Sequence, residues 1–127
     1  MDGDLHLRHG VTPEQLKNRT QKFAVDVIHL CRELPTTLDG RRCGSQLLDA
    51  ATAVAANYRA ACRGRSRAEF AAKLGVVVEE ADECLFWLQL IIAAGLLPRT
   101  RIAALLREAD ELTAIFVASR NTVMGHK

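Results

Sequence analysis

Residues 57–70, NYRAACRGRSRAEF, mark the boundary between two helices and decide how the rest of the chain folds. Gly64 is the residue type that commonly follows the end of a helix. Ser66, followed three residues later by Glu69, forms the capping-box pattern that begins a new helix. The same stretch carries four arginines within nine positions, so this helix junction is also a candidate anion-binding site.

Apolar residues recur at helical spacing on both sides of this junction. The helix before it, which ends near Arg63, has an apolar face made of Leu47, Ala50, Ala51, Val54, Tyr58 and Ala61. The helix after it runs to about Ala94 and is closed by Gly95. Projected at about 100° per residue, its predicted inner face comprises Phe70, Leu74, Val77, Val78, Ala81, Leu85, Leu88 and Ile92.

Two further helices flank this pair. Thr12, Pro13 and Gln15 form a helix start, with a capping threonine and a proline in the first turn. The apolar stripe that follows ends before Pro35 and comprises Leu16, Phe23, Val27, Leu30 and Leu34. Residues 35–44 hold a proline and two glycines, which predicts a polar connection. The last helix follows Pro98, and its stripe comprises Ile102, Leu105, Ala109, Leu112, Phe116 and Ser119.

Four amphipathic helices joined by short turns, with no competing strand pattern, predict an all-α protein. The expected fold is an antiparallel, up-down-up-down four-helix bundle. We place the bundle domain at residues 13–121, between a flexible N-terminal tail at residues 1–12 and a frayed C-terminal tail at residues 122–127.

The composition is that of one ordinary globular domain, with 49% hydrophobic and 25% charged residues in 127 positions. A net charge of +2 is too small to indicate a nucleic-acid partner by itself, so any basic signal must come from clustering. The four cysteines are far apart and form no zinc-binding pair. Neither a leader nor a membrane-spanning run is evident, so we expect a cytoplasmic protein with reduced thiols and no cofactor.

A second apolar face is predicted on the helix that starts at Ser66. Val76, Phe86, Trp87 and Leu90 project opposite its inner face, and such a patch is typical of a subunit interface. Small residues on the preceding helix allow another backbone to approach closely. The expected interface comprises Ala53, Ala56, Asn57, Ala60, Val76, Glu80, Glu83, Phe86, Trp87 and Leu90.

Residues 51–90, ATAVAANYRAACRGRSRAEFAAKLGVVVEEADECLFWLQL, resemble the signature of the bacterial four-helix bundle protein family. That family includes proteins encoded by intervening sequences of 23S rRNA genes and the accessory variability protein of diversity-generating retroelements. The matching positions are Ala53, Asn57, Tyr58, Arg63, Arg65, Ser66, Glu69, Phe70, Leu74, Glu80, Ala81, Glu83, Trp87 and Leu88. The resemblance extends over about residues 16–116.

The resemblance implies a bundle that assembles into a ring, most often a homopentamer. It implies no enzyme, because the family has no established catalytic residues. In the retroelement branch the ring is positively charged and binds nucleic acid and a reverse transcriptase. We therefore expect a non-enzymatic oligomeric scaffold or adaptor, whose first partners to test are RNA, DNA and a nucleic-acid enzyme.

The arginine-rich turn has two interpretations. Its side chains form a candidate phosphate-binding set, because guanidinium groups match phosphate oxygens and repetition around a ring would form a basic belt. This set comprises Arg59, Arg63, Arg65, Arg67 and Lys73. Alternatively the turn is a solvated junction, in which arginines compensate the end of the preceding helix and pair with Glu69.

The alternative function is a magnesium-dependent nucleotide pyrophosphohydrolase. Residues 79–83, EEADE, match the Glu-Glu-x-x-Glu element of the all-α NTP pyrophosphatases. Those enzymes also bind magnesium through a later Glu-x-x-Asp element, and residues 108–111, EADE, lie at a similar distance downstream but end in glutamate. The helical projection points Glu79 and Glu83 away from the last helix, which disfavours convergence on one metal ion. Asp26 and His29 lie one turn apart, but bundle metal sites need more ligands than this pair supplies.

Overall fold

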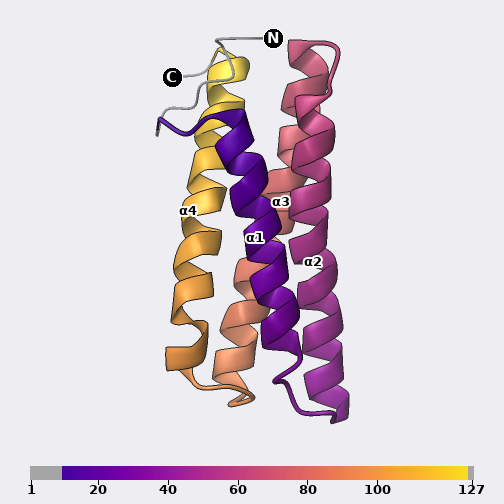
Figure 1. Ribbon diagram of the computed structural model, residues 1–127, viewed down its shortest axis with the longest axis vertical. Coiled ribbons are helices and arrows are strands. Elements are labelled where there is room, and N and C mark those ends of the chain that lie inside the picture. Colours follow the sequence, from indigo (N-terminus) through magenta and orange to yellow (C-terminus); the bar gives the residue numbers. More distant parts are fainter. Residues whose placement is uncertain (1–9, 126–127) are drawn as a thin grey trace.

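The computed structural model describes residues 10–125, and these form four α-helices without a strand. The helices are α1 (Pro13–Cys31), α2 (Leu38–Cys62), α3 (Arg67–Ala93) and α4 (Arg99–Val123). Figure 1 shows them side by side in one bundle, with the α1–α2 and α3–α4 turns at one end and the α2–α3 turn at the other. The predicted all-α, four-helix architecture is confirmed. Residues 1–9 and 126–127 of the predicted tails lie outside the described residues.

Hydrogen bonds at the start of α1 and α3 explain where these helices begin. The Thr12 hydroxyl accepts from the Gln15 N–H at 3.1 Å, and the Gln15 side chain accepts from the Thr12 N–H at 2.9 Å. Ser66 likewise accepts from the Glu69 N–H at 3.1 Å. Both predicted helix starts are therefore confirmed, because each hydroxyl satisfies a backbone donor that has no partner within its helix.

The start of α2 differs from the prediction of a polar connection over residues 35–44. The helix begins at Leu38, where Thr37 caps it by accepting from the Gly40 N–H at 3.3 Å. A side chain at position 40 would collide with the Pro35 carbonyl group. Gly40 therefore permits a close crossing of two backbone segments within the first helical turn. At the other end of the chain, α4 continues to Val123, two residues beyond the predicted bundle domain.

The core confirms the predicted inner faces of α1, α2 and α4, since every residue assigned to them is buried. On α3 the prediction was partly wrong, because Val78, Leu85 and Ile92 lie half-buried at the edges. The buried α3 residues are Phe70, Leu74, Val77, Ala81, Cys84, Leu88 and Ile91. The buried residues follow one another at intervals of four and three positions, which is a period of about 3.5 residues. A straight helix has about 3.6 residues per turn and departs from that period by about 20° in each heptad. A fixed projection therefore missed Cys84 and Ile91.

Arg19 and Arg101 form ion pairs that link α4 to α1 and to the turn after α1. The helices α1 and α4 pack against each other less closely than the other neighbouring helices do. The Arg19 guanidinium donates to both oxygens of Glu108, at 2.7 and 3.1 Å. In the first turn of α4, Arg101 binds Glu33, which follows α1. Within residues 10–125, no helix is long and apolar enough to cross a membrane.

Candidate nucleic-acid and subunit interfaces

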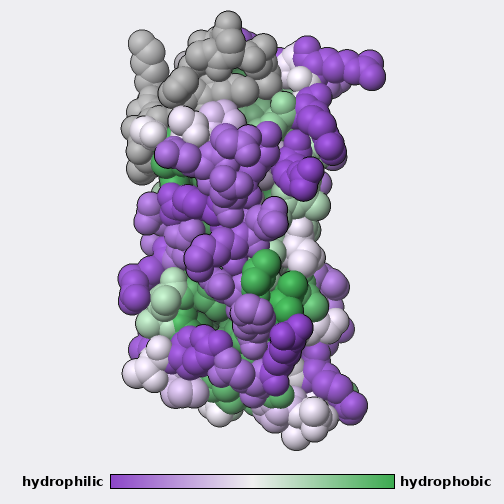
Figure 2. Space-filling view, in the orientation of Figure 1, coloured by the Kyte–Doolittle hydropathy of each residue, from purple (hydrophilic) through white to green (hydrophobic). Residues whose placement is uncertain are grey.

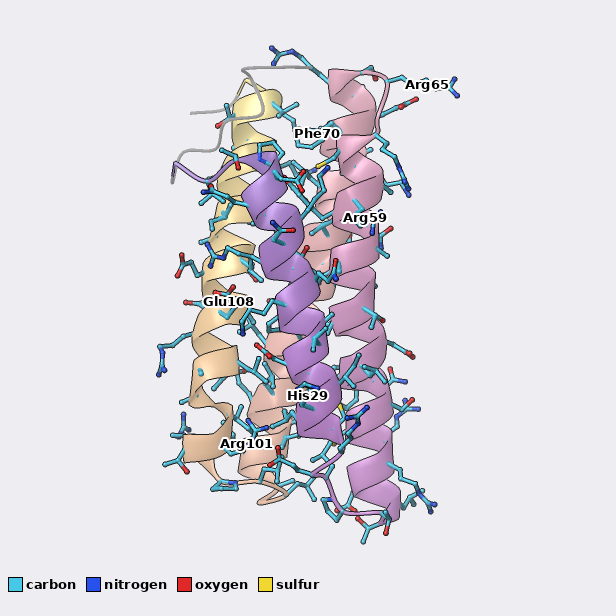
Figure 3. All side chains as sticks on the ribbon, viewed as in Figure 1. His29, Arg59, Arg65, Phe70, Arg101 and Glu108 are labelled. Carbon is cyan, nitrogen blue, oxygen red and sulfur yellow. The ribbon has the colours of Figure 1, made fainter. Side chains whose placement is uncertain are left out.

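The arginine-rich turn lies at the end of the bundle where α2 meets α3. Figure 3 shows Arg65 projecting from this end and Arg59 on α2, nearer the middle of the bundle. Arg59, Arg63 and Arg65 are exposed, and none of them forms an ion pair with any residue of the described range 10–125. Three uncompensated cations therefore gather at this end.

Glu69 stabilises the turn through the backbone N–H of Arg65. Its carboxylate accepts from the Arg65 N–H at 2.7 Å, one residue further back than in an ordinary capping box. The interpretation in which Glu69 neutralises the arginines is therefore wrong for Arg65, whose guanidinium stays available.

Three of the candidate phosphate-binding residues line two grooves, whereas Arg65 and Arg67 line neither of them. Arg59 and Arg63 line a groove of about 270 Å³ between α1 and α2, together with Lys17. Lys73 lines a second hollow of about 350 Å³ between α2 and α3, where Arg63 contributes again. Because Arg63 borders both hollows, the basic residues form one continuous surface around the end of α2.

Sequence reasoning missed the part of this surface that α1 supplies. Lys17, Asn18 and Gln21 face Arg59 and Arg63 across the α1–α2 groove. These three residues lie on the polar side of α1, and nothing in their local pattern links them to arginines about forty positions later. The signal that locates them is the pairing of α1 with α2, which only the structure supplies.

The predicted subunit interface is a partly apolar strip along α2 and α3. Val76, Phe86 and Leu90 are 38%, 54% and 37% exposed. On α2, Ala53, Asn57 and Ala60 are half-buried, while on α3 Glu80 is half-buried and Glu83 exposed. Ala56 is exposed but lines the groove between α1 and α2, so it does not belong to this strip as predicted. The strip therefore carries small residues and large apolar side chains at the surface.

Trp87 does not point outward as the helical projection predicted. Its side chain is half-buried and packs against the core. Its ring also meets Phe86 edge to face, with centroids 4.9 Å apart and planes at 78°. The 3.5-residue period of α3 again explains the difference, because it turns position 87 toward the core. Phe86 is therefore the more exposed aromatic residue.

Carboxylates crowd the middle of the same strip. Burial raises the pKa of Glu80, and the negative charges of Glu83, Glu79 and Asp49 raise it further. Asp49 belongs to α2, so the two helices share this acidic region. Glu108 and Glu111 lie on another side of the bundle, where Arg19 contacts them at 2.7 and 3.3 Å. In the range 10–125, no three His, Cys, Asp or Glu residues lie close enough to hold a metal ion.

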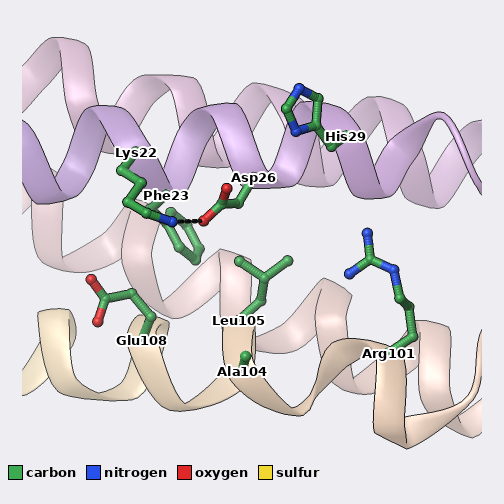
Figure 4. A pocket seen from close by; sticks show the side chains of 8 residues that line it. All are labelled: Lys22, Phe23, Asp26, His29, Arg101, Ala104, Leu105 and Glu108. Atoms are coloured by element: carbon green, nitrogen blue, oxygen red, sulfur yellow. Dashed lines mark hydrogen bonds and ion pairs between the residues drawn. The ribbon is translucent and has the colours of Figure 1, made fainter.

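Asp26 and His29 line a groove of about 370 Å³ between α1 and α4 (Figure 4). The Lys22 ammonium group contacts the Asp26 carboxylate at 2.8 Å, and the figure shows this pair bridging one turn of α1. Asp26 is thus engaged by a cation. Arg101 and Glu108 complete the polar rim, while Phe23 and Leu105 form part of the lining.

All four cysteines are free thiols. Burial raises the pKa of Cys84 to about 12 and that of Cys31 to about 11. These two thiols remain protonated at neutral pH, which makes them weak nucleophiles.

Comparison with known proteins identifies the family. The model of the family described as "23S rRNA-intervening sequence protein" matches residues 14–118. The chain belongs to this family. The match to the 23S rRNA-intervening sequence proteins covers most of the bundle. It confirms the part of the sequence-based resemblance that named these proteins.

A solved structure has a fold similar to that of this 23S rRNA-intervening sequence protein. It is a protein of unknown function from the S23 ribosomal protein family of Bacteroides thetaiotaomicron VPI-5482, similar to this chain with a TM-score of 0.79 and 26% sequence identity. The alignment covers 86% of this chain and 97% of that one. No curated protein matches the chain.

Proposed function

We propose that this member of the 23S rRNA-intervening sequence protein family is a non-enzymatic, homo-oligomeric scaffold that binds nucleic acid. The observation that carries the proposal is the group of exposed arginines at the α2–α3 end, Arg59, Arg63 and Arg65, which form no ion pair within residues 10–125. Arg19 and Arg101, in contrast, are engaged by carboxylates.

Phosphate groups are the ligands that such a surface suits. A guanidinium group offers a planar fork of donors to phosphate oxygens, and each contact releases counterions from the nucleic acid. Lys73 and Arg67 extend the set that sequence analysis proposed. Contacts of this kind are independent of base sequence, so we expect general binding to RNA or DNA.

Self-association multiplies this surface. We propose that the antiparallel bundle is the subunit of a ring, which the resemblance implies is a homopentamer, and that the α2–α3 strip forms its contacts. Exposed Val76, Phe86 and Leu90 beside the alanines of α2 support this assignment. In a ring, the basic end of each subunit recurs at regular intervals and forms a belt. Such a belt also suits an enzyme bound to the same nucleic acid, such as a reverse transcriptase in the retroelement branch.

The proposal includes no catalytic step. Glu108 and Glu111 are occupied by Arg19, and the carboxylates of residues 79–83 lie along an exposed strip. The four free thiols suit a reducing compartment, so we propose the cytoplasm as the location.

A binding titration tests the nucleic-acid role. RNA and duplex DNA are titrated at several salt concentrations with the wild type and with a variant in which Arg59, Arg63, Arg65 and Arg67 become glutamine. We expect salt-sensitive binding by the wild type, and weaker binding with a flatter salt dependence for the variant. Absence of salt-sensitive binding to either probe by the wild type at low salt would refute the role.

A further inference from the structure

The groove between α1 and α2 has a polar half at the end nearest the arginine-rich turn. Lys17 from α1 faces Arg59 and Arg63 from α2, and the amides of Asn18 and Gln21 lie beside them. Glu14 is the one carboxylate in this lining, and its side chain is 76% exposed with an oxygen 3.5 Å from the Lys17 nitrogen. Three cations against one peripheral carboxylate leave this half positively charged.

The groove continues into an apolar half of about 410 Å³. Gln21, Arg59 and Arg63 line both halves, so the two hollows are continuous. The floor of the second half is formed by Ala24, Val25, Ala55 and Ala56. Val25 is 40% exposed, and Figure 2 shows hydrophobic side chains at the surface where α1 and α2 lie side by side.

The polar groups of the groove differ in their availability. Thr52 donates to the carbonyl oxygens of Leu48 and Asp49, which uses its only hydrogen-bond donor. Asn18 and Gln21 form no side-chain hydrogen bond within residues 10–125. Two amides are thus free to pair with polar groups of a ligand. Beside them, the cations can bind an anionic group and the aliphatic side chains can contact a flat apolar surface.

We propose that this groove is a binding site for single-stranded nucleic acid, an inference that rests on the proposed function. A phosphodiester group lies between Lys17, Arg59 and Arg63, and an adjoining nucleobase lies with its face on the floor made by Val25, Ala55 and Ala56. Asn18 and Gln21 donate to the sugar or to the edge of the base. The alanines keep the floor open, because a longer side chain there would fill the space that the base takes.

The apolar half is what selects a single strand. In a duplex the bases are paired and stacked inside the helix, so their faces do not reach a protein surface. A duplex therefore engages only the cations and leaves the floor empty. An aliphatic floor makes few demands on base identity, so we expect binding to tolerate different sequences.

Three matched pairs of measurements test the site by fluorescence anisotropy, using a labelled single-stranded RNA of about 12 nucleotides and its duplex. The first compares R59Q/R63Q with R41Q/R42Q, which removes the same charge from the other end of α2. We expect the first variant to raise Kd for the single strand about tenfold and to reduce the salt slope by about 1 to 1.5. The control should stay within about twofold.

The second pair compares Ala56→Gln, which fills the floor without adding charge, with Ala114→Gln at an exposed position of α4. Ala56→Gln should raise Kd for the single strand about threefold or more and leave duplex binding unchanged, because only the single strand uses the floor. Ala114→Gln should change neither Kd. The third pair compares the single strand with the duplex on the wild type, and the single strand should bind more tightly.

Two outcomes separate this inference from the proposed function. Equal affinity for duplex and single strand, or an equal effect of R41Q/R42Q and R59Q/R63Q, would overturn the groove and leave general nucleic-acid binding in place. If the wild type shows no salt-sensitive binding to either the single strand or the duplex, the groove site and the proposed function are both wrong. Circular dichroism of every variant confirms that the bundle is folded.

Discussion

The Glu69 carboxylate accepts a hydrogen bond from the backbone N–H of Arg65 at 2.7 Å, across the turn that joins α2 to α3. The backbone N–H of Glu69 in turn donates to the Ser66 hydroxyl at 3.1 Å. Residues 65–69 are therefore held by reciprocal side-chain to backbone bonds, and the Arg65 guanidinium group is not needed for them. This division separates the groups that stabilise the turn from those available to a ligand.

Replacing Ser66 by alanine should destabilise the protein by about 1 kcal/mol, because an N-terminal N–H of α3 loses its acceptor. Urea denaturation at neutral pH measures the effect. Ser45→Ala serves as the control, since Ser45 is exposed within α2 and should change the free energy of unfolding by less than about 0.5 kcal/mol. Nucleic-acid binding should be unchanged in both variants. A Ser66→Ala protein as stable as the control would show that the cap contributes nothing.

Glu80→Gln should stabilise the subunit near neutral pH. In the folded state, burial and the charges of Glu83, Glu79 and Asp49 raise the pKa of Glu80 above its ordinary 4.5. Its ionised form is therefore disfavoured by folding, and the wild type loses stability as pH rises from 4.5 through the folded pKa. Glutamine removes that loss. The gain should be present at pH 7 and absent below pH 4.5, as measured by thermal denaturation at both pH values.

A pH-independent change in the melting temperature of Glu80→Gln would contradict this account. Glu111→Gln is a suitable comparison, because Arg19 contacts that carboxylate and the substitution should not stabilise the protein.

The helices could be predicted from the sequence because their caps and apolar stripes are local signals. The inner face of α3 was harder, since Cys84 and Ile91 are selected by a 3.5-residue period that differs only slightly from that of an isolated helix. Over a helix of 27 residues this small difference accumulates. It explains both the missed core residues and the misplaced Trp87.

The candidate site could be predicted only in part. Arg59, Arg63 and Arg65 stand out as a cluster along the chain. The residues that complete the groove, Lys17 and Gln21, come from another helix and depend on how α1 lies against α2. Gly40 is a similar case, because its role is set by the nearby carbonyl group of Pro35 and not by its neighbours in sequence.

Tyr58→Phe should leave the protein equally stable or slightly more stable. The Tyr58 ring is fully buried and packs against Phe116, with centroids 5.5 Å apart. Its hydroxyl is buried and lies beside the Cys62 thiol, but no contact of good hydrogen-bond geometry satisfies it among residues 10–125. Because sulfur is a weak hydrogen-bonding group, removing the hydroxyl eliminates most of a desolvation cost of about 1–3 kcal/mol. Chemical denaturation measures the change. A loss of more than about 1 kcal/mol would show that the hydroxyl is hydrogen-bonded in solution.

The hydrolase alternative predicts that magnesium and a nucleoside triphosphate yield pyrophosphate. We expect no turnover above background, since Glu108 is bound to Arg19 and the carboxylates of residues 79–83 lie on a different side of the bundle. A pyrophosphate-release assay with the wild type measures this. Metal-dependent hydrolysis that disappears in both Glu80→Gln and Glu83→Gln would establish the enzyme and replace the scaffold proposal.

Light scattering on the wild type should give a mass several times the 14.0 kDa of the chain, near five subunits if the ring is a pentamer. Phe86 is the sharpest probe of the contact, because its side chain is 54% exposed on the α2–α3 strip. Phe86→Glu should reduce the mass toward that of the monomer, since it places an unpaired charge in the interface. Helical circular dichroism should be retained, because Phe86 is not part of the buried core.

Two comparisons define what this result means. Leu38→Glu introduces the same charge at a leucine that is 83% exposed at the start of α2, and it should leave the mass unchanged. Trp87→Glu should instead unfold or weaken the bundle, because Trp87 packs against the core and a buried charge without a partner is costly. A wild-type protein that is a single monomeric species at concentrations of tens of micromolar would end the oligomer proposal. A Phe86→Glu variant that keeps the full mass would move the interface to another face.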